Sequence, residues 1–303
     1  MIFDGATRTR PAMLPPRPCQ RDLRAERAFC VETARLAVGA LHTELTLYPK
    51  PGLVSLVDNG SHADMTAAIF VRSMFALRHY FIAICRAGID DAPFAVLKQL
   101  GIDAEARMMK ATGGVNTHRG AIFSLGMLCA AAGRARAECI APTPASLRAI
   151  LLIRWGEDLA AHTQAAGDVS HGVRAAILYA ASGAREEGAL GLPSVFEVGL
   201  PTLQRTLAAG RSMYHARIDA LFALMAHVSD TNVFHRGGTD GAATVKRRAQ
   251  RFGEMGGTAD PGWRAYAAEC HRLFVADRLS PGGAADLLAA TCLVHALGAR
   301  GTA

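Results

Sequence analysis

Small and apolar residues recur along much of this chain at spacings of three and four, and this feature limits the fold more than any other. Within residues 24–47 these positions are Val31, Ala34, Val38, Leu41 and Leu45. Such spacings place side chains on one face of an α-helix, whereas a half-buried β-strand needs strict alternation. No convincing run of alternating polar and β-branched residues occurs. The sequence therefore predicts an all-α fold.

The composition agrees with closely packed helices. Hydrophobic residues make up 50% of the 303 residues, while aromatic residues account for only 6%. Alanine supplies much of the hydrophobic half, and it has the highest helix propensity. We expect roughly ten helices in a single compact domain over residues 23–303, after a flexible N-terminal arm over residues 1–22.

Proline and glycine residues set the expected helix boundaries. Thr143 followed by Pro144 has the chemistry of an N-cap and a first helical position. Asp260-Pro261 and Ser280-Pro281 repeat this pattern. The other expected helices cover residues 24–47, 65–85, 93–110, 120–133, 193–209, 212–228 and 240–255. The polar segments between helices are then the candidates for ligand contacts.

The charge and the cysteines narrow the class of protein. The formal charge of +7 favours anionic partners. No nucleic-acid-binding motif occurs, and small polyphosphate ligands fit the sign of the charge equally well. Seven scattered cysteines without a CxxC pair argue against a disulfide framework and a structural zinc site. The N-terminus lacks a secretion signal, and apolar segments such as residues 121–132 are too short to span a bilayer. We expect a cytoplasmic protein without membrane or nucleic-acid partners.

The first of four polar segments covers residues 49–65. It contains Lys50, Asp58, His62 and Asp64, and Glu44 precedes it. Asp58 and Asp64 could converge on Mg²⁺, which prefers oxygen ligands, or they could cap the following helix. His62 is a weaker metal candidate, because Ala63 interrupts the His-Asp dipeptide of His-Asp phosphohydrolases.

The other three segments cover residues 112–120, 229–238 and 280–288. Their candidate residues are Asn116, Thr117, His118, Arg119, Asp230, Asn232, Arg236, Gly282 and Gly283. Amide, hydroxyl and guanidinium donors near a helix start suit a phosphate, but a glycine turn with a helix cap explains them equally well. The paired glycines in the last segment would let a backbone approach a ligand, or let two helices touch.

Five stretches of sequence, taken together, resemble the triphosphoribosyl-dephospho-CoA synthase family. They are "PKPGLVSLVDNGSHADM", "GGVNTHRGAIFSLGML", "SGAREEGALGLPSV", "DTNVFHRGG" and "SPGGAADLLA". They occur in the family's order over nearly the whole chain. Within the family, the spacing in "PKPGLVSLVDNGSH" is more similar to the branch that serves malonate decarboxylase than to the branch that serves citrate lyase.

The resemblance implies an all-helical transferase that joins ATP to 3'-dephospho-CoA and releases adenine. The product is the precursor of the prosthetic group of an acyl carrier subunit, so the enzymes of that pathway are candidate partners. Mg²⁺ is the expected cofactor and ATP the expected substrate. A homo-oligomer is one of the states that the sequence allows.

The implied reaction gives each candidate residue a hypothetical role. Displacement of adenine at the ribose C1 carbon passes through an oxocarbenium-like centre, which calls for a base, for cations and for a donor to the leaving group. We assign Asp58 and Asp64 to Mg²⁺, and Glu44 or Asp230 to the general base. His62 or His118 would contact the departing adenine. The expected substrate and phosphate contacts are Lys50, Asn116, Thr117, Arg119, Arg185, Asn232, Arg236, Gly282 and Gly283.

Two other classes of function compete with this interpretation. A helical, Mg²⁺-dependent N-glycosidic hydrolase of the ADP-ribosyl type would use the same carboxylates to direct water instead of a sugar hydroxyl. A non-catalytic nucleotide-binding adaptor would bind ATP without forming adenine. Adenine release from ATP, with and without dephospho-CoA, distinguishes the three.

Overall fold

The computed structural model describes residues 22–164 and 187–300. Within these ranges it contains α-helices, one π-helical segment and one 3-10 turn, and no β-strand. The elements are α1 (Leu23–Thr46), α2 (Ala67–Ile89), α3 (Phe94–Thr112), α4 (Arg119–Ala137), α5 (Pro144–Gln164), η2 (Ser194–Gly199), α7 (Leu200–Ala208), α8 (Met213–His227), α9 (Thr231–Glu254), η3 (Gly257–Ala259), α10 (Trp263–Ala276) and α11 (Gly282–Arg300). The predicted all-α fold is confirmed.

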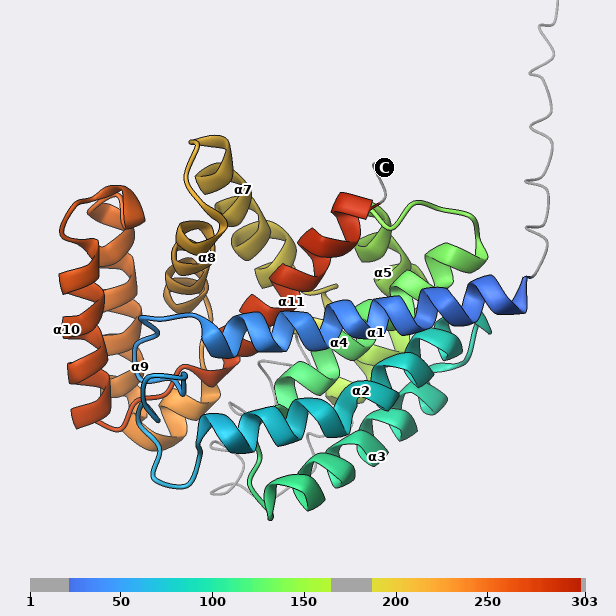
Figure 1. The fold of residues 1–303 in the computed structure, drawn as a ribbon, viewed down its shortest axis with the longest axis horizontal. Helices are drawn as coiled ribbons and strands as arrows, with labels where there is room; N and C mark the ends of the chain where they lie inside the picture. Colours follow the sequence, from blue (N-terminus) through green and yellow to red (C-terminus); the bar gives the residue numbers. More distant parts are fainter. Residues whose placement is uncertain (1–21, 165–186, 301–303) are drawn as a thin grey trace, which may run out of the picture.

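Helix α11 joins the two groups of helices that make up the molecule. Helices α1 to α5 form one group, and α7 to α10 form the other (Figure 1). Helix α11 runs between them and contacts α1, α4, α8 and η2. Its residues Leu288, Leu293 and Val294 have no exposed surface. The start of this central helix therefore lies where both groups meet.

Small residues bring helices α2 and α4 unusually close together. A Cβ atom added to Gly88 of α2 would lie 2.0 Å from the carbonyl oxygen of Ala130 of α4. A Cβ atom added to Gly133 of α4 would lie 2.0 Å from the carbonyl oxygen of Cys85 of α2. Both approaches are too short for any side chain, so close helix packing follows from the small residues that the composition contains.

Two predicted loops are helical over much of their length. The sequence predicts a loop over residues 229–238, but α9 already begins at Thr231. The Asp230 carboxylate caps this helix, because it accepts the backbone N–H groups of Asn232 and Val233 at 2.9 and 3.4 Å. Gly238, with φ 62°, makes a kink inside the helix instead of a loop. The predicted loop over residues 280–288 likewise contains the first turns of α11.

Helices α2 and α11 are long and apolar enough to span a membrane by length and composition. The prediction that the apolar segments are too short is wrong for these two. The apolar window is 39% buried in α2 and 61% buried in α11. Because a core helix of a soluble protein passes the same test, this finding is weak support for membrane insertion.

Most of the described cysteines are free, in line with the predicted lack of a disulfide framework. Cys30, Cys85, Cys129, Cys270 and Cys292 are buried free thiols. Cys139, however, is disulfide-bonded.

Candidate active site

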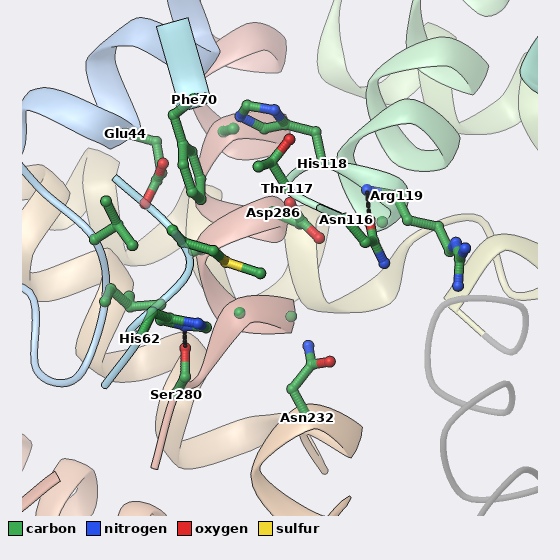
Figure 2. A pocket seen from close by; sticks show the side chains of 18 of the residues that line it. Glu44, His62, Phe70, Asn116, Thr117, His118, Arg119, Asn232, Ser280 and Asp286 are labelled. Atoms are coloured by element: carbon green, nitrogen blue, oxygen red, sulfur yellow. Dashed lines mark hydrogen bonds between the residues drawn. The ribbon is translucent and has the colours of Figure 1, made fainter. Parts of the chain in front are cut away.

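A cavity of about 310 Å³, called here the main cavity, lies where several helices begin or end. It is bounded by the last turn of α1, the segment 49–65, the starts of α2, α4 and α11, and two residues of α9. Figure 2 shows side chains from these elements around one space. Helix starts carry unpaired backbone N–H groups and a partial positive charge, which suits a cavity for anions.

The main cavity gathers most of the residues that the sequence singles out. These are Glu44, His62, Asn116, Thr117, His118, Arg119, Asn232, Arg236, Gly282 and Gly283. All four polar segments therefore contribute to one cavity. Arg185 lies outside the described residues, and the chemical role of each lining residue stays a prediction.

Lys50 does not line the cavity, although it supports a residue that does. Its side chain is 1% exposed, and its ammonium group forms an ion pair with the Glu44 carboxylate. Burial lowers the pKa of Lys50, while the Glu44 charge opposes this shift. A phosphate has no direct access to Lys50, whose interaction with the cavity passes through Glu44.

Asp58 and Asp64 are also absent from the cavity lining. The Asp58 carboxylate accepts the Gly60 N–H at 2.8 Å and lies 3.3 Å from His271 Nε2. The Asp64 side chain is 64% exposed. Both carboxylates lie in the segment 49–65 without converging on the site.

The magnesium role expected for Asp58 and Asp64 stays a prediction. No group of three or more His, Cys, Asp or Glu side chains among them is placed to hold a metal ion. Mg²⁺ commonly binds proteins through one or two carboxylates and takes its other ligands from water and substrate phosphates. A magnesium ion that enters with ATP is compatible with this site and needs no dedicated cage.

His62 is held in one tautomer at the edge of the main cavity. An Arg236 guanidinium nitrogen donates to His62 Nδ1 at 3.1 Å, so Nε2 carries the proton and donates to Ser280 Oγ at 2.8 Å. Burial and the Arg236 charge lower the pKa of His62 to about 4. Arg236 also donates to the Ser61 carbonyl oxygen at 3.1 Å. The imidazole is neutral near pH 7 and helps to position Arg236.

His118 combines complete burial with an unpartnered ring nitrogen. Thr117 Oγ1 donates to Ser73 Oγ at 2.8 Å, and Ser73 Oγ lies 2.7 Å from His118 Nδ1. The Ser73 hydroxyl is thus free to donate to Nδ1, which leaves the proton on Nε2. Burial and the charge of Lys50 lower the pKa of His118 to about 3. Nε2 is buried without a hydrogen-bond partner and offers a neutral donor.

The start of α4 supplies a second guanidinium group. His118 occupies the N-cap position without making a side-chain cap. Instead, Asn116 Oδ1 accepts the Arg119 N–H at 3.2 Å, as a capping residue would. Arg119 Nε donates to Glu105 of α3 at 2.6 Å, which anchors the guanidinium beside the cavity. The phosphate and capping interpretations of this segment are compatible, because Asn116 both supports the turn and lines the cavity.

Asp230 ties two helix starts together. Its Oδ1 atom accepts N–H groups at the start of α9, and its Oδ2 atom accepts those of Gly283 and Ala284 at 2.7 and 3.2 Å. A Cβ atom on Gly283 would lie 3.0 Å from Asp230 Oδ2, so the glycine permits this approach. Burial raises the pKa of Asp230, and the four N–H groups oppose the shift. Its carboxylate is engaged on both oxygens.

Asp286 is the residue of the cavity that sequence reasoning missed. It lies one turn into α11, where its neighbours in sequence are apolar, and it lines the main cavity (Figure 2). Burial and the charges of Glu44 and Asp230 raise its pKa well above the ordinary 3.8, while the Ala121 N–H opposes this. An acidic residue inside the apolar stretch "GGAADLLAA" is the signal that could have identified it.

Two further cavities continue from the main cavity towards α9. A side cavity of about 60 Å³ shares Gly120, Gly283 and Asp286 with the main cavity. An outer cavity of about 380 Å³ shares Val228, Ser229 and Asp230 with the side cavity. The outer cavity is mostly apolar, with Lys246 as its basic residue. Asp286 stands at the boundary between the first two cavities.

An all-helical scaffold in which helix starts, two arginines and two carboxylates line one cavity suits an enzyme that acts on a phosphorylated ligand. Residues 30–302 match the family described as CitG, ATP:dephospho-CoA triphosphoribosyl transferase. The chain belongs to this family, and it is a transferase.

Curated relatives agree with this assignment over most of their length. A probable 2-(5''-triphosphoribosyl)-3'-dephosphocoenzyme-A synthase of Pseudomonas aeruginosa is 43% identical over 277 residues, which cover 89% of this chain and 91% of the relative. A protein of the same name from Azotobacter vinelandii is 41% identical, with 87% and 90% covered. One from Acinetobacter calcoaceticus is 40% identical, with 84% and 87% covered. No solved structure matches the chain.

Proposed function

We propose that this chain transfers the triphosphoribosyl group of ATP to the 2'-hydroxyl of 3'-dephospho-CoA and releases adenine. Membership of the family supports the reaction. The observation that carries the proposal is the main cavity, whose lining brings together Arg119, Arg236 and the carboxylates of α1 and α11. Cations that hold a polyphosphate and a carboxylate that serves an incoming hydroxyl are the groups this transfer needs.

The triphosphate fits the part of the main cavity near Arg236 and the start of α4. Arg236 is fixed by Ser61 and His62, and Arg119 is fixed by Glu105, so both guanidinium groups are positioned before substrate binds. Guanidinium groups form strong, charge-assisted hydrogen bonds to phosphate oxygens. The helix start adds backbone donors and the positive end of its dipole. Mg²⁺ enters as part of the substrate, bound to the phosphates of ATP.

The departing adenine fits beside His118. The Nε2–H group of His118 is a buried donor without a partner, and a purine nitrogen would accept its proton in a hydrogen bond. Phe70 packs against the same imidazole with ring centroids 4.9 Å apart and adds an aromatic surface to the cavity. His62 has both ring nitrogens engaged, so His118 is the better of the two candidates.

An assay for adenine tests the proposed reaction. The purified enzyme is incubated with ATP and Mg²⁺, with or without dephospho-CoA, and the products are separated by chromatography and weighed by mass spectrometry. We expect one adenine for each triphosphoribosyl-dephospho-CoA, with little adenine when dephospho-CoA is omitted. Free triphosphoribose from ATP alone would instead support an ADP-ribosyl-type hydrolase. Binding of ATP without adenine release would support a non-catalytic adaptor.

We also propose that the product serves malonate decarboxylase in the cytoplasm, where enzymes of the acyl carrier pathway would be partners. The spacing of residues 49–65 supports this branch over the citrate lyase branch. Because both branches use the same product, a gene deletion tests the assignment better than an assay. Loss of growth on malonate with unchanged growth on citrate is the expected result, and the reverse pattern would contradict it.

A further inference from the structure

Three carboxylates surround the junction between the main and side cavities, and they differ in how far their oxygens are engaged. Glu44 is paired with the buried ammonium of Lys50. Asp230 accepts four backbone N–H groups, two on each oxygen. The backbone N–H of Ala121 acts on Asp286 by lowering its pKa. Among the described residues, Asp286 is therefore the carboxylate of the three with neither a cationic partner nor backbone donors on both oxygens.

The position of Asp286 distinguishes it further. It lines both the main cavity and the side cavity, whereas Glu44 lines the main cavity and Asp230 lines the side and outer cavities. The backbone of Gly120 makes room for it, because a Cβ atom there would lie 2.2 Å from Asp286 Oδ2. A group at this boundary can contact two substrates that approach from opposite sides.

The chemical difference between the main and outer cavities matches the difference between the two substrates. The lining of the main cavity includes Arg119 and Arg236 and suits the triphosphate of ATP. The outer cavity, which shares lining residues with the side cavity, is lined by apolar residues such as Met225, Val233 and Phe234, with Lys246 beside them. This surface suits the adenosine of dephospho-CoA, whose ribose would then lie near the side cavity.

We propose that Asp286, rather than Glu44 or Asp230, is the general base that takes the proton of the 2'-hydroxyl of dephospho-CoA. This inference rests on the proposed function. As the proton moves to the carboxylate, the 2'-oxygen forms a bond to the ribose C1 carbon of ATP. The bond from C1 to adenine N9 breaks, and its electron pair leaves with adenine. The proton then passes from Asp286 to the departing base, which leaves as neutral adenine and regenerates the carboxylate.

The surroundings of Asp286 give it the basicity that this role requires. The charged groups that face it are Glu44 of α1 and Asp230 before α9, and both charges raise its pKa, as does burial. Helix α4 contributes the Ala121 N–H, which acts in the opposite direction. A carboxylate with a raised pKa accepts a proton more readily near neutral pH than an ordinary aspartate does.

Kinetics of Asp286→Asn test the assignment. We expect kcat for adenine release to fall by about 10²–10⁴-fold, the usual contribution of a general base, with KM for ATP and dephospho-CoA changed by less than about threefold. The acidic limb of the wild-type profile of kcat against pH should disappear from the residual activity. The exposed Asp240→Asn on α9 is the matched control and should behave as the wild type does.

A second variant separates chemistry from folding. In Asp286→Ala, added formate should restore part of the adenine release, because a free carboxylate can occupy the vacated volume. Restoration by formate and loss of the acidic limb support the proposal. A kcat of Asp286→Asn within threefold of the wild type, or an acidic limb that persists in this variant, would overturn it. If the wild-type enzyme itself released no adenine, the proposed function would fail instead.

Discussion

The segment 49–65 and the start of α11 differ in how well their charged residues predict the lining of the main cavity. The segment is dense in charged residues, yet Lys50, Asp58 and Asp64 are used for internal contacts or exposed to solvent. The start of α11 is nearly apolar, yet it places Asp286 in the cavity. In these two segments the position of a single charge in an apolar helix is thus a better guide to the cavity lining than the density of charged residues.

The largest effect should come from breaking the buried ion pair of the polar segment. Lys50→Met leaves the Glu44 carboxylate buried without its partner, and we expect the free energy of unfolding to fall by about 3–5 kcal/mol. Urea denaturation measures this change. The double variant Glu44→Leu/Lys50→Met should recover much of the loss, because it removes both charges. A loss below about 1 kcal/mol in the single variant would show that the pair is not buried as described.

A methyl group beside Asp286 should have the next largest effect. In Gly120→Ala the new Cβ atom would lie 2.2 Å from Asp286 Oδ2, so the carboxylate must move. A displacement of about 1 Å in a catalytic group can reduce the rate by about 10²-fold. Steady-state adenine release should show this reduction in kcat while circular dichroism stays helical. An unchanged kcat would place the chemistry away from α11.

Removal of a phosphate contact should act on binding more than on chemistry. Arg236→Ala removes a charged donor worth about 1.5–3 kcal/mol, so KM for ATP should rise by about 10–100-fold. The matched variant Arg247→Ala removes a guanidinium from α9 that does not line the main cavity. Only Arg236→Ala should weaken ATP binding in isothermal titration calorimetry. Equal effects of both variants would indicate a general charge effect.

The two cavity histidines predict how stability depends on pH. Their pKa values are lowered to about 4 for His62 and about 3 for His118, from an ordinary 6.5. Between each lowered pKa and the ordinary value of 6.5, the unfolded chain binds more protons than the folded protein does. The free energy of unfolding should therefore rise with pH up to about 6.5. His118→Asn should flatten this dependence in thermal unfolding measured from pH 4.5 to pH 7.5. A slope equal to that of the wild type would mean that His118 is protonated in the folded protein.

The smallest effect should come from the carboxylates that look most like metal ligands. Asp64→Asn changes an exposed side chain, so stability should change by less than about 0.5 kcal/mol and kcat by less than about threefold. Asp58→Asn should cost somewhat more stability, because its carboxylate holds Gly60 and His271. Adenine release at saturating MgATP measures both variants. A fall of orders of magnitude would support the magnesium role predicted from the sequence.

The helical fold and much of the cavity lining could be predicted from the sequence, for identifiable reasons. Helical spacing and alanine content determine the fold class, and the residues of the four polar segments meet because they flank helix starts. The segment 229–238 was misassigned because Asp230 and Gly238, which resemble loop residues, cap and kink α9. Asp286 was missed because its importance depends on Glu44 and Asp230, which are distant in sequence and close in space.

A crystal structure of Asp286→Asn with MgATP and dephospho-CoA bound is the most direct test of where the reaction occurs. The triphosphate should lie on Arg236 and the start of α4, with the 2'-oxygen of dephospho-CoA within hydrogen-bond distance of residue 286. Nucleotide bound instead at Asp58 and Asp64, with the space between α4 and α11 left to solvent, would contradict the account.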